Sequence, residues 1–285
     1  AVVRDLCAPI DAAKAFSQLM LIMGVAPILA PLAGGAMLKV AGWPSIFWFL
    51  TLFSALFALA VYFFLPETLP EDTPPARLGS ALGRYLGLLR EPVFMFHSLT
   101  GGVAMAGMFA YIAGSPYIFI EMYGLSVDHY AWLFGANAAG FILFAQLNSR
   151  LLRHNTPLSL LKGTTGVYCA ATVTLLVVAL LHSPNIWLFL PPLFCSVAVI
   201  SLVIPNASAC ALAGHGHQAG VASALMGTMQ FAIAGLTSAL VGVLHDGSSV
   251  PMALVMAGCG VVTVTMAFLA RRASARAPQP NWASR

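Results

Sequence analysis

The feature that most constrains this chain is a series of long apolar runs from which charged side chains are almost absent. A helix needs roughly 20 apolar residues to cross about 30 Å of hydrocarbon. Eight runs qualify, and they cover approximately Phe16–Leu38, Trp43–Leu65, Val93–Ile120, Tyr130–Asn148, Thr164–Leu181, Ile186–Leu212, Gly220–Leu244 and Pro251–Ala270. None shows the two-residue alternation of barrel strands. The sequence therefore predicts an all-α membrane protein with eight transmembrane helices, surrounded by a lipid bilayer.

The composition agrees with a lipid environment. Hydrophobic residues make up 60% of the 285 residues and charged residues only 8%, whereas charged residues are about a quarter of a typical soluble domain. The basic residues are too scattered to form a nucleic-acid surface, although the formal net charge is +4. The five cysteines stand singly, and we interpret them as small core residues. We expect no metal site, no cofactor and no nucleic-acid partner.

The distribution of Lys and Arg predicts the orientation of the chain. Twelve of the thirteen basic residues lie on the same side as the N-terminus when the eight spans alternate, and only Lys39 lies on the other side. Short loops rich in Lys and Arg remain in the cytoplasm. We therefore predict that both ends of this chain are cytoplasmic, together with the long polar loop 66–92.

This polar loop divides the chain. Residues 1–65 contain two spans, residues 93–272 contain a bundle of six, and residues 273–285 form a cytoplasmic tail. We interpret the Pro-rich start of the loop as a linker. The stretch "LGSALGRYLGLL" in the same loop is compatible with a short amphipathic helix on the membrane surface.

A weak internal repeat suggests how the two parts are related. The stretches "SQLMLIM" (Ser17–Met23) and "SALMGTM" (Ser223–Met229) share four residues at an offset of 206. Two halves related by a parallel repeat are a common transporter plan, and on that offset roughly 110 residues would precede Ala1. We therefore expect the chain to be the latter part of a carrier with twelve helices.

Seven segments strengthen the interpretation as a transporter. They are "AVVRDL", "MGVAPILAPLAGG", "GWPSIFWFL", "LPETL", "YGLSVDHYAWLFGANAAGFIL", "PNASACALAGHGHQAGVASALMG" and "GVLHDGSSVPMALVM". In order and spacing they resemble the bicyclomycin-resistance (Bcr/CflA) group of drug exporters in the major facilitator superfamily. The resemblance extends from the end of the family's fourth helix through its twelfth. It implies proton-driven export of small, often amphipathic, drugs across the bacterial inner membrane.

The segment Gly24–Gly35 is similar to the antiporter motif of the family's fifth helix, with Ala in place of Gly before the second proline. Its small or helix-bending positions are Gly24, Pro27, Ala30, Pro31, Gly34 and Gly35. Each proline removes a backbone donor and bends the helix, and the glycines allow a neighbouring helix to approach closely. We predict that this helix seals the outer half of a cavity against ion leak. Close packing of a kinked helix is the alternative.

Polar and polarizable side chains within the spans are candidates for a substrate cavity. Asn137 and Gln230 lie mid-span, where a polar group facing lipid is costly. An interhelical hydrogen bond is the alternative role for both. The candidates for an adaptable apolar and aromatic wall are Met23, Met105, Phe109, Tyr111 and Met229. Ordinary helix packing is the alternative for these five.

Charged residues are absent from the centres of the eight spans. We therefore expect the carboxylate that couples proton flow to lie in helices that precede this chain. Arg4, Asp5 and Glu67 fall at the predicted inner boundary, where related transporters latch their closed state, although solvated boundary charges are the alternative.

Histidines near the inner boundary have a simpler interpretation. We interpret His97, His215 and His217 as interfacial residues rather than as a switch or a metal site.

No enzyme motif accompanies these features. The chain has no H-E-x-x-H, no G-x-S-x-G and no pair of buried aspartates. The sequence thus predicts a proton-coupled drug exporter. An exporter of a metabolite or amino acid with the same fold is the alternative, because a few pocket side chains decide the substrate. The sequence does not indicate an oligomeric state.

Overall fold

The computed structural model describes residue 30 and residues 33–65, 78–182, 185–215 and 218–276. In these residues all regular secondary structure is helical. The chain forms two units, Ala1–Ala76 with Ser126–Ala139, and Arg77–Leu125 with Gly140–Arg285. We describe each unit separately.

The first unit contains the helical residues 33–41, helix α3 (Pro44–Phe64) and the beginning of α6 (Val127–Leu151). Gly42 separates the first two helical segments with a φ of 70°, a conformation that glycine adopts without strain. Pro44 then begins α3, where the helix needs no backbone N–H, so the missing N–H of proline costs no helical hydrogen bond. No residue of α3 is buried, although the helix is apolar throughout. An apolar surface of this length requires lipid or other helices around it.

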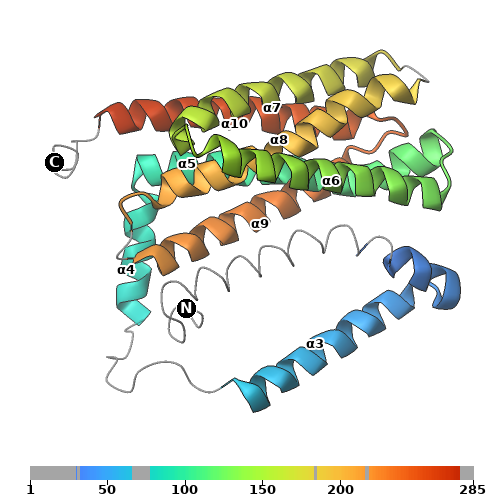
Figure 1. Ribbon diagram of the computed structural model, residues 1–285, viewed down its shortest axis with the longest axis horizontal. Coiled ribbons are helices and arrows are strands. Elements are labelled where there is room, and N and C mark those ends of the chain that lie inside the picture. The colour runs from blue at the N-terminus through green and yellow to red at the C-terminus, as the bar shows by residue number, and fades with distance from the viewer. Residues whose placement is uncertain (1–29, 31–32, 66–77, 183–184, 216–217, 277–285) are drawn as a thin grey trace. The chain divides into compact units, whose positions relative to one another are not determined.

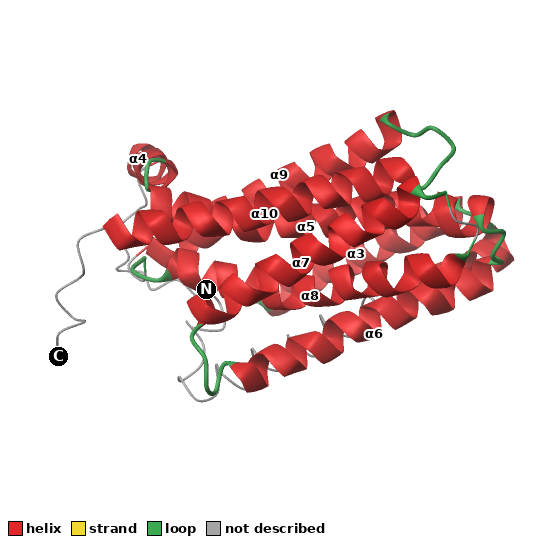
Figure 2. Ribbon diagram, turned by 90° about the horizontal axis from the view of Figure 1, so that it is seen from above, coloured by secondary structure: helices red, strands yellow, loops and turns green. Residues whose placement is uncertain are grey.

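The second unit is a helical bundle. It contains α4 (Leu78–Leu89), α5 (Pro92–Pro116), η1 (Tyr117–Met122), the remainder of α6, α7 (Pro157–Leu180), α8 (Ile186–Leu212), α9 (Ala219–Val243) and α10 (Val250–Arg276). Helix α5 packs against α8, α9 and α10, while α7 packs against α8 and α10. The long helices run side by side, and α4 lies across their ends (Figures 1 and 2). Helix α5 is therefore the central helix of the bundle.

Seven helices of the described residues are long and apolar enough to cross a membrane: α3, α5 continued by η1, α6, α7, α8, α9 and α10. They confirm seven of the eight predicted spans. Most of the remaining one, Phe16–Leu38, lies outside the described residues. Helix α4 coincides with the predicted amphipathic stretch "LGSALGRYLGLL".

The predicted boundaries of three spans were wrong by several residues, and one of these is the end of α10, which continues to Arg276 rather than Ala270. Helix α7 begins at Pro157 rather than Thr164, because the Thr156 hydroxyl accepts a hydrogen bond from the Ser159 backbone N–H (3.2 Å) and Pro157 occupies the first helical position. Helix α6 begins at Val127 rather than Tyr130 and continues to Leu151. In each case the polar end turns are helical but do not contribute to a hydropathy signal.

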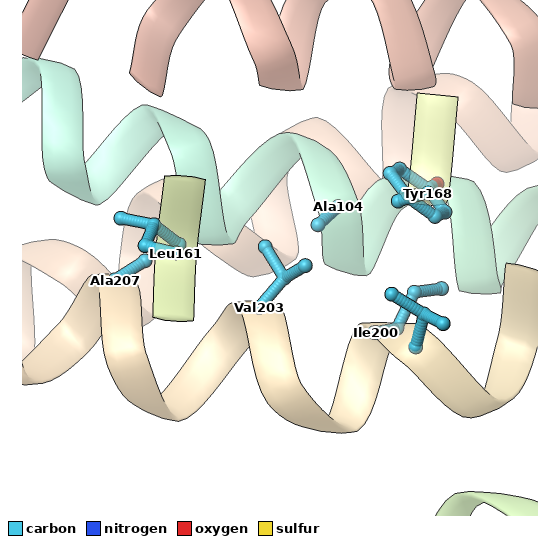
Figure 3. Packing of buried hydrophobic residues seen from close by; sticks show 7 residues of the cluster. Ala104, Leu161, Tyr168, Ile200, Val203 and Ala207 are labelled. Atoms are coloured by element: carbon cyan, nitrogen blue, oxygen red, sulfur yellow. The ribbon is translucent and has the colours of Figure 1, made fainter. Parts of the chain in front are cut away.

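The core of the bundle lies where α5, α7 and α8 meet. Its buried residues are Ala104, Leu161, Tyr168, Val199, Ile200, Val203 and Ala207 (Figure 3). Small residues allow these helices to approach closely, as is usual in membrane bundles. At Gly107 an added Cβ would collide with the hydroxyl of Tyr168. At Gly260 of α10 an added Cβ would lie 3.1 Å from the Cα of Cys169 and collide with the hydroxyl of Thr172.

We predict that Gly260→Ala destabilises the bundle, because its methyl group would force α10 away from α7. Overpacking of this kind costs about 1–3 kcal/mol. The measurement is the apparent melting temperature of the purified chain in detergent. Gly258→Ala is the matched control, since it makes the same change in the same helix and a Cβ there meets no atom within 4 Å. Equal losses of stability in the two variants would contradict the prediction.

Candidate functional site

The candidate site lies along the contact between α5 and α9, which we call the α5–α9 seam. Two adjacent glycines of α5 allow α9 to approach. A Cβ on Gly102 would lie 3.4 Å from the Cγ of Gln230 and 3.6 Å from its Cα. A Cβ on Gly101 would lie 3.6 Å from the Gln230 Nε2. The amide of Gln230 is thus placed against the backbone of α5.

Hydrogen bonds extend this contact along the seam. The hydroxyl of Thr237 lies 3.2 Å from the carbonyl oxygen of Ala106, and the hydroxyl of Ser238 donates to the carbonyl oxygen of Phe109 (3.4 Å). The rings of Phe109 and Phe231 meet edge to face, with 6.1 Å between their centroids. The seam therefore combines helix-to-helix hydrogen bonds with aromatic surface.

Two of the predicted cavity residues, Phe109 and Gln230, contact the facing helix at this seam, and two more, Met105 and Met229, lie on the same two helices. Met105 and Phe109 are half-buried and stand one turn apart on α5, while Met229 and Gln230 are half-buried on α9. Residues four apart share a face of a helix. Tyr111 differs from them, since it is only 2% exposed and lies within the bundle. Met23 lies outside the described residues.

A cavity of about 200 Å³ adjoins the far end of the seam. Ser238 lines both, and the other lining groups include Gly114, Tyr117, His245 and Met252. The rings of Tyr117 and His245 are in edge-to-face contact, with 4.2 Å between their centroids. The cavity thus has a mixed polar and apolar lining, and it is smaller than the roughly 300–1,000 Å³ of typical small-molecule sites.

The loop between α9 and α10 contains an acidic residue, Asp246. The hydroxyl and the backbone N–H of Ser248 donate to its carboxylate at 2.7 and 2.9 Å. These hydrogen bonds hold the pKa of the Asp246 carboxyl below its usual range. Asp246 is therefore an ionised group near neutral pH rather than a proton carrier.

Asn137 belongs to the first unit. Its side chain is buried, and its Nδ2 donates to the carbonyl oxygen of Leu133 in the same helix (3.0 Å). The Oδ1 of Asn137 has no hydrogen-bond partner among the described residues.

Asn206, a buried amide in α8, was not among the residues predicted from the sequence. Asn206 is 1% exposed, and its Nδ2 donates to the Oδ1 of Asn148 on α6 (2.7 Å) and to the carbonyl oxygen of Leu202 (2.7 Å). The Asn206 Oδ1 has no partner in the described part of the chain. The criterion that selected Gln230, a polar residue inside an apolar run, also applies to Asn206.

Two of the three histidines interpreted as interfacial have buried side chains. His97 is 2% exposed, because it stands one turn before Gly101 on the side of α5 that faces the other helices. His215 is buried and pairs with Glu91. His217 lies outside the described residues.

Other predicted residues have no structural test. Those outside the described residues are Arg4, Asp5, Gly24, Pro27, Pro31 and Glu67. Ala30 is exposed, and a Cβ on Gly34 or Gly35 would meet nothing within 4 Å. The close packing predicted at these two glycines thus has no partner among the described residues. Within the same residues, no group of three or more His, Cys, Asp or Glu side chains could hold a metal ion.

Comparison with known proteins gives a consistent result. The sequence profile of the Major Facilitator Superfamily matches residues 1–239. An uncharacterized MFS-type transporter of Bacillus subtilis, YdgK, is 34% identical over 90% of this chain and 64% of its own length. A bicyclomycin resistance protein homolog of Haemophilus influenzae is 28% identical over 93% of the chain and 66% of its own length.

A third relative is the multidrug resistance protein MdtL of Salmonella typhi. It is 25% identical over 94% of the chain and 66% of its own length. The chain thus spans 64% to 66% of the length of these three relatives.

We predict that Asn206→Leu lowers the apparent melting temperature, because it leaves the buried Asn148 amide without its partner. An unsatisfied buried polar group costs about 1–3 kcal/mol. The double variant Asn206→Leu with Asn148→Leu removes both partners, so it should recover much of the loss. Double-mutant analysis of the purified chain in detergent measures the coupling between them. Strictly additive losses would contradict the hydrogen bond.

Proposed function

Because the chain belongs to the major facilitator superfamily, we propose that it functions as a proton-coupled multidrug efflux transporter, a drug:proton antiporter, of the bacterial inner membrane. The observation that carries the proposal is the similarity over 93% of the chain to a bicyclomycin resistance protein homolog. A relative named for multidrug resistance, similar over 94% of the chain, supports the same substrate class.

The side chains of the α5–α9 seam suit amphipathic, drug-sized substrates. Met105 and Met229 are flexible and polarizable, so they adapt to ligands of different shape. Phe109 and Phe231 offer flat apolar surface. The amide of Gln230 can donate or accept a hydrogen bond and thereby orient a polar group of the ligand. We propose that this surface of the seam contacts the exported drug.

The driving force in this proposal is the proton gradient. Export against a hundredfold gradient requires about 2.7 kcal/mol, and one charge that crosses 100 mV supplies about 2.3 kcal/mol. A single protonatable group nearly suffices.

The acidic residues of the described spans, Glu121 and Asp128, lie at helix ends. We therefore place the coupling carboxylate outside this chain. The 285 residues alone should show no proton-driven efflux, and such efflux would contradict this placement.

The proposed orientation has both ends of this chain in the cytoplasm. It rests on the distribution of Lys and Arg, which would place α4 at the inner membrane surface. Arg84 and Arg90, both exposed, would then lie near the anionic lipids of the inner leaflet.

We predict that the complete reading frame encoding this chain raises drug resistance when it is expressed in a bacterium whose own drug pumps are deleted. The minimal inhibitory concentration of each drug in a chemically varied panel is the measurement. An uncoupler that dissipates the proton gradient should abolish the difference in drug accumulation between expressing and control cells. Unchanged resistance to every drug, together with increased excretion of an amino acid or metabolite, would favour the alternative substrate class.

We further predict that Gln230→Leu alters resistance unevenly across the same panel. Loss of one hydrogen bond costs about 0.5–1.5 kcal/mol, or roughly two- to tenfold in affinity, but only for drugs that use the amide. Gln146→Leu is the matched control, because it makes the same change at an exposed position of α6. Membrane abundance of each variant is measured in parallel. A uniform loss for all drugs, or equal effects of the two variants, would contradict a role in substrate contact.

A further inference from the structure

A buried histidine and a carboxylate meet at one end of the second unit. His215 follows α8 and Glu91 precedes α5, and the Nε2 of His215 lies 2.7 Å from the Oε2 of Glu91. The imidazole is only 7% exposed, whereas the Glu91 side chain is 45% exposed. The two residues are 124 positions apart in the sequence, so the contact joins two distant segments.

Local backbone bonds hold both residues in place. The His215 backbone N–H donates to the carbonyl oxygen of Leu212 (3.0 Å), and that of Glu91 donates to the carbonyl oxygen of Leu88 (3.1 Å). The Phe94 ring meets the imidazole edge to face, with 5.4 Å between their centroids. The orientation of the imidazole is therefore determined by its surroundings and not only by Glu91.

The hydrogen-bond partners of the imidazole require a bound proton. Its Nδ1 lies 3.1 Å from the carbonyl oxygen of Ala211, which can only accept, so this contact is a hydrogen bond when Nδ1 carries a hydrogen. In a neutral ring the Nε2 is then a bare lone pair, and it would face the lone pair of an ionised carboxylate at 2.7 Å. That arrangement is repulsive. For both contacts to be hydrogen bonds, one proton must lie between the two groups, either on Nε2 as an imidazolium or on Glu91 as a carboxylic acid.

We propose that His215 and Glu91 form a proton-binding site that closes this end of the second unit. Closing the contact takes up one proton when the separated groups are a neutral imidazole and a carboxylate, and opening the contact releases it. The site is distinct from the carboxylate proposed to drive transport, and its proton binding does not depend on the transport function. The ligand of this site is the proton itself.

The surroundings connect this contact to four helices. An apolar cluster joins α4, α5, α8 and α9 near the pair, and its buried residues are Leu88, Phe94, Ala211, Ala222 and Met226. Phe94 and Ala211 belong to the cluster and also touch the imidazole. Figure 1 shows α4 lying beside the start of α5 and of α9. The pair therefore lies where the ends of four helices pack together.

Few other charges act on the pair. Among the described residues, the other titratable or charged side chains on the elements that meet there are Arg84, Tyr85, Arg90, His97, Tyr111, Cys195 and Cys210, and α9 contributes none between Ala219 and Val243. Within the described residues, Glu91 is the acidic group recorded in contact with the imidazole. In the part of the chain that the structure describes, the proton requirement thus belongs to the pair.

Hydrogen exchange of the purified chain measures the closing equilibrium directly. The reporters are backbone amides at the pair, in peptides that contain Glu91, Met95 and His215, under conditions where reclosing is faster than intrinsic exchange. Protection is corrected for the intrinsic pH dependence of exchange. Because closing takes up one proton, protection should fall by up to about tenfold for each unit rise in pH over the range in which the separated imidazole is neutral. Peptides from the middle of α7 serve as the internal reference.

Two variants separate proton binding from mere packing. Glu91→Gln introduces an amide that can donate to a neutral Nε2, so the contact persists without a bound proton. His215→Gln replaces the titratable ring with an amide that can donate to the carboxylate. In both variants the protection at the pair should no longer depend on pH. A pH-independent protection in the unmodified chain, or the same slope in Glu91→Gln, would overturn the proposal.

Discussion

The requirement that every backbone group in hydrocarbon be hydrogen-bonded within the protein determines most of this structure. Water is absent there, so the chain crosses the bilayer as helices. The hydrophobic effect does not drive these helices together within the bilayer, because lipid tails are as apolar as leucine. Their association depends instead on close approach. Gly114 shows how close this is, since an added Cβ would lie 2.8 Å from the Cγ of Met252 on α10.

Polar side chains within the bundle satisfy the same requirement in two ways. Thr165 and Thr172 donate to carbonyl oxygens one turn earlier in their own helix, at 2.8 and 3.0 Å. Such bonds satisfy the hydroxyl but specify no neighbour. Asn206 and Ser238 instead reach carbonyl or amide oxygens of another helix. These interhelical bonds fix which faces meet, and they identify the positions where polarity has a structural or functional role.

The sequence was sufficient to predict the helices because hydropathy is a local property. Seven predicted spans and the amphipathic α4 lie where apolar periodicity placed them, and errors are confined to polar end turns such as Thr156–Ser159. The pairings between helices were not predictable. Asn206 bonds a residue 58 positions away and His215 a residue 124 positions away. Only the folded bundle brings such pairs together, and the burial of His97 could not be predicted for the same reason.

The α5–α9 seam and the helix ends at the His215–Glu91 pair have different physical tasks in the proposed carrier. A substrate surface must tolerate many shapes, which favours flexible thioethers and flat rings over fixed polar contacts. The end of a bundle that opens and closes needs the opposite, namely a contact with only two states. A contact that takes up one proton on closing changes in free energy by about 1.4 kcal/mol per pH unit. That change is comparable with the cost of a few helix-end contacts, so a single buried pair is sufficient to bias such a closure.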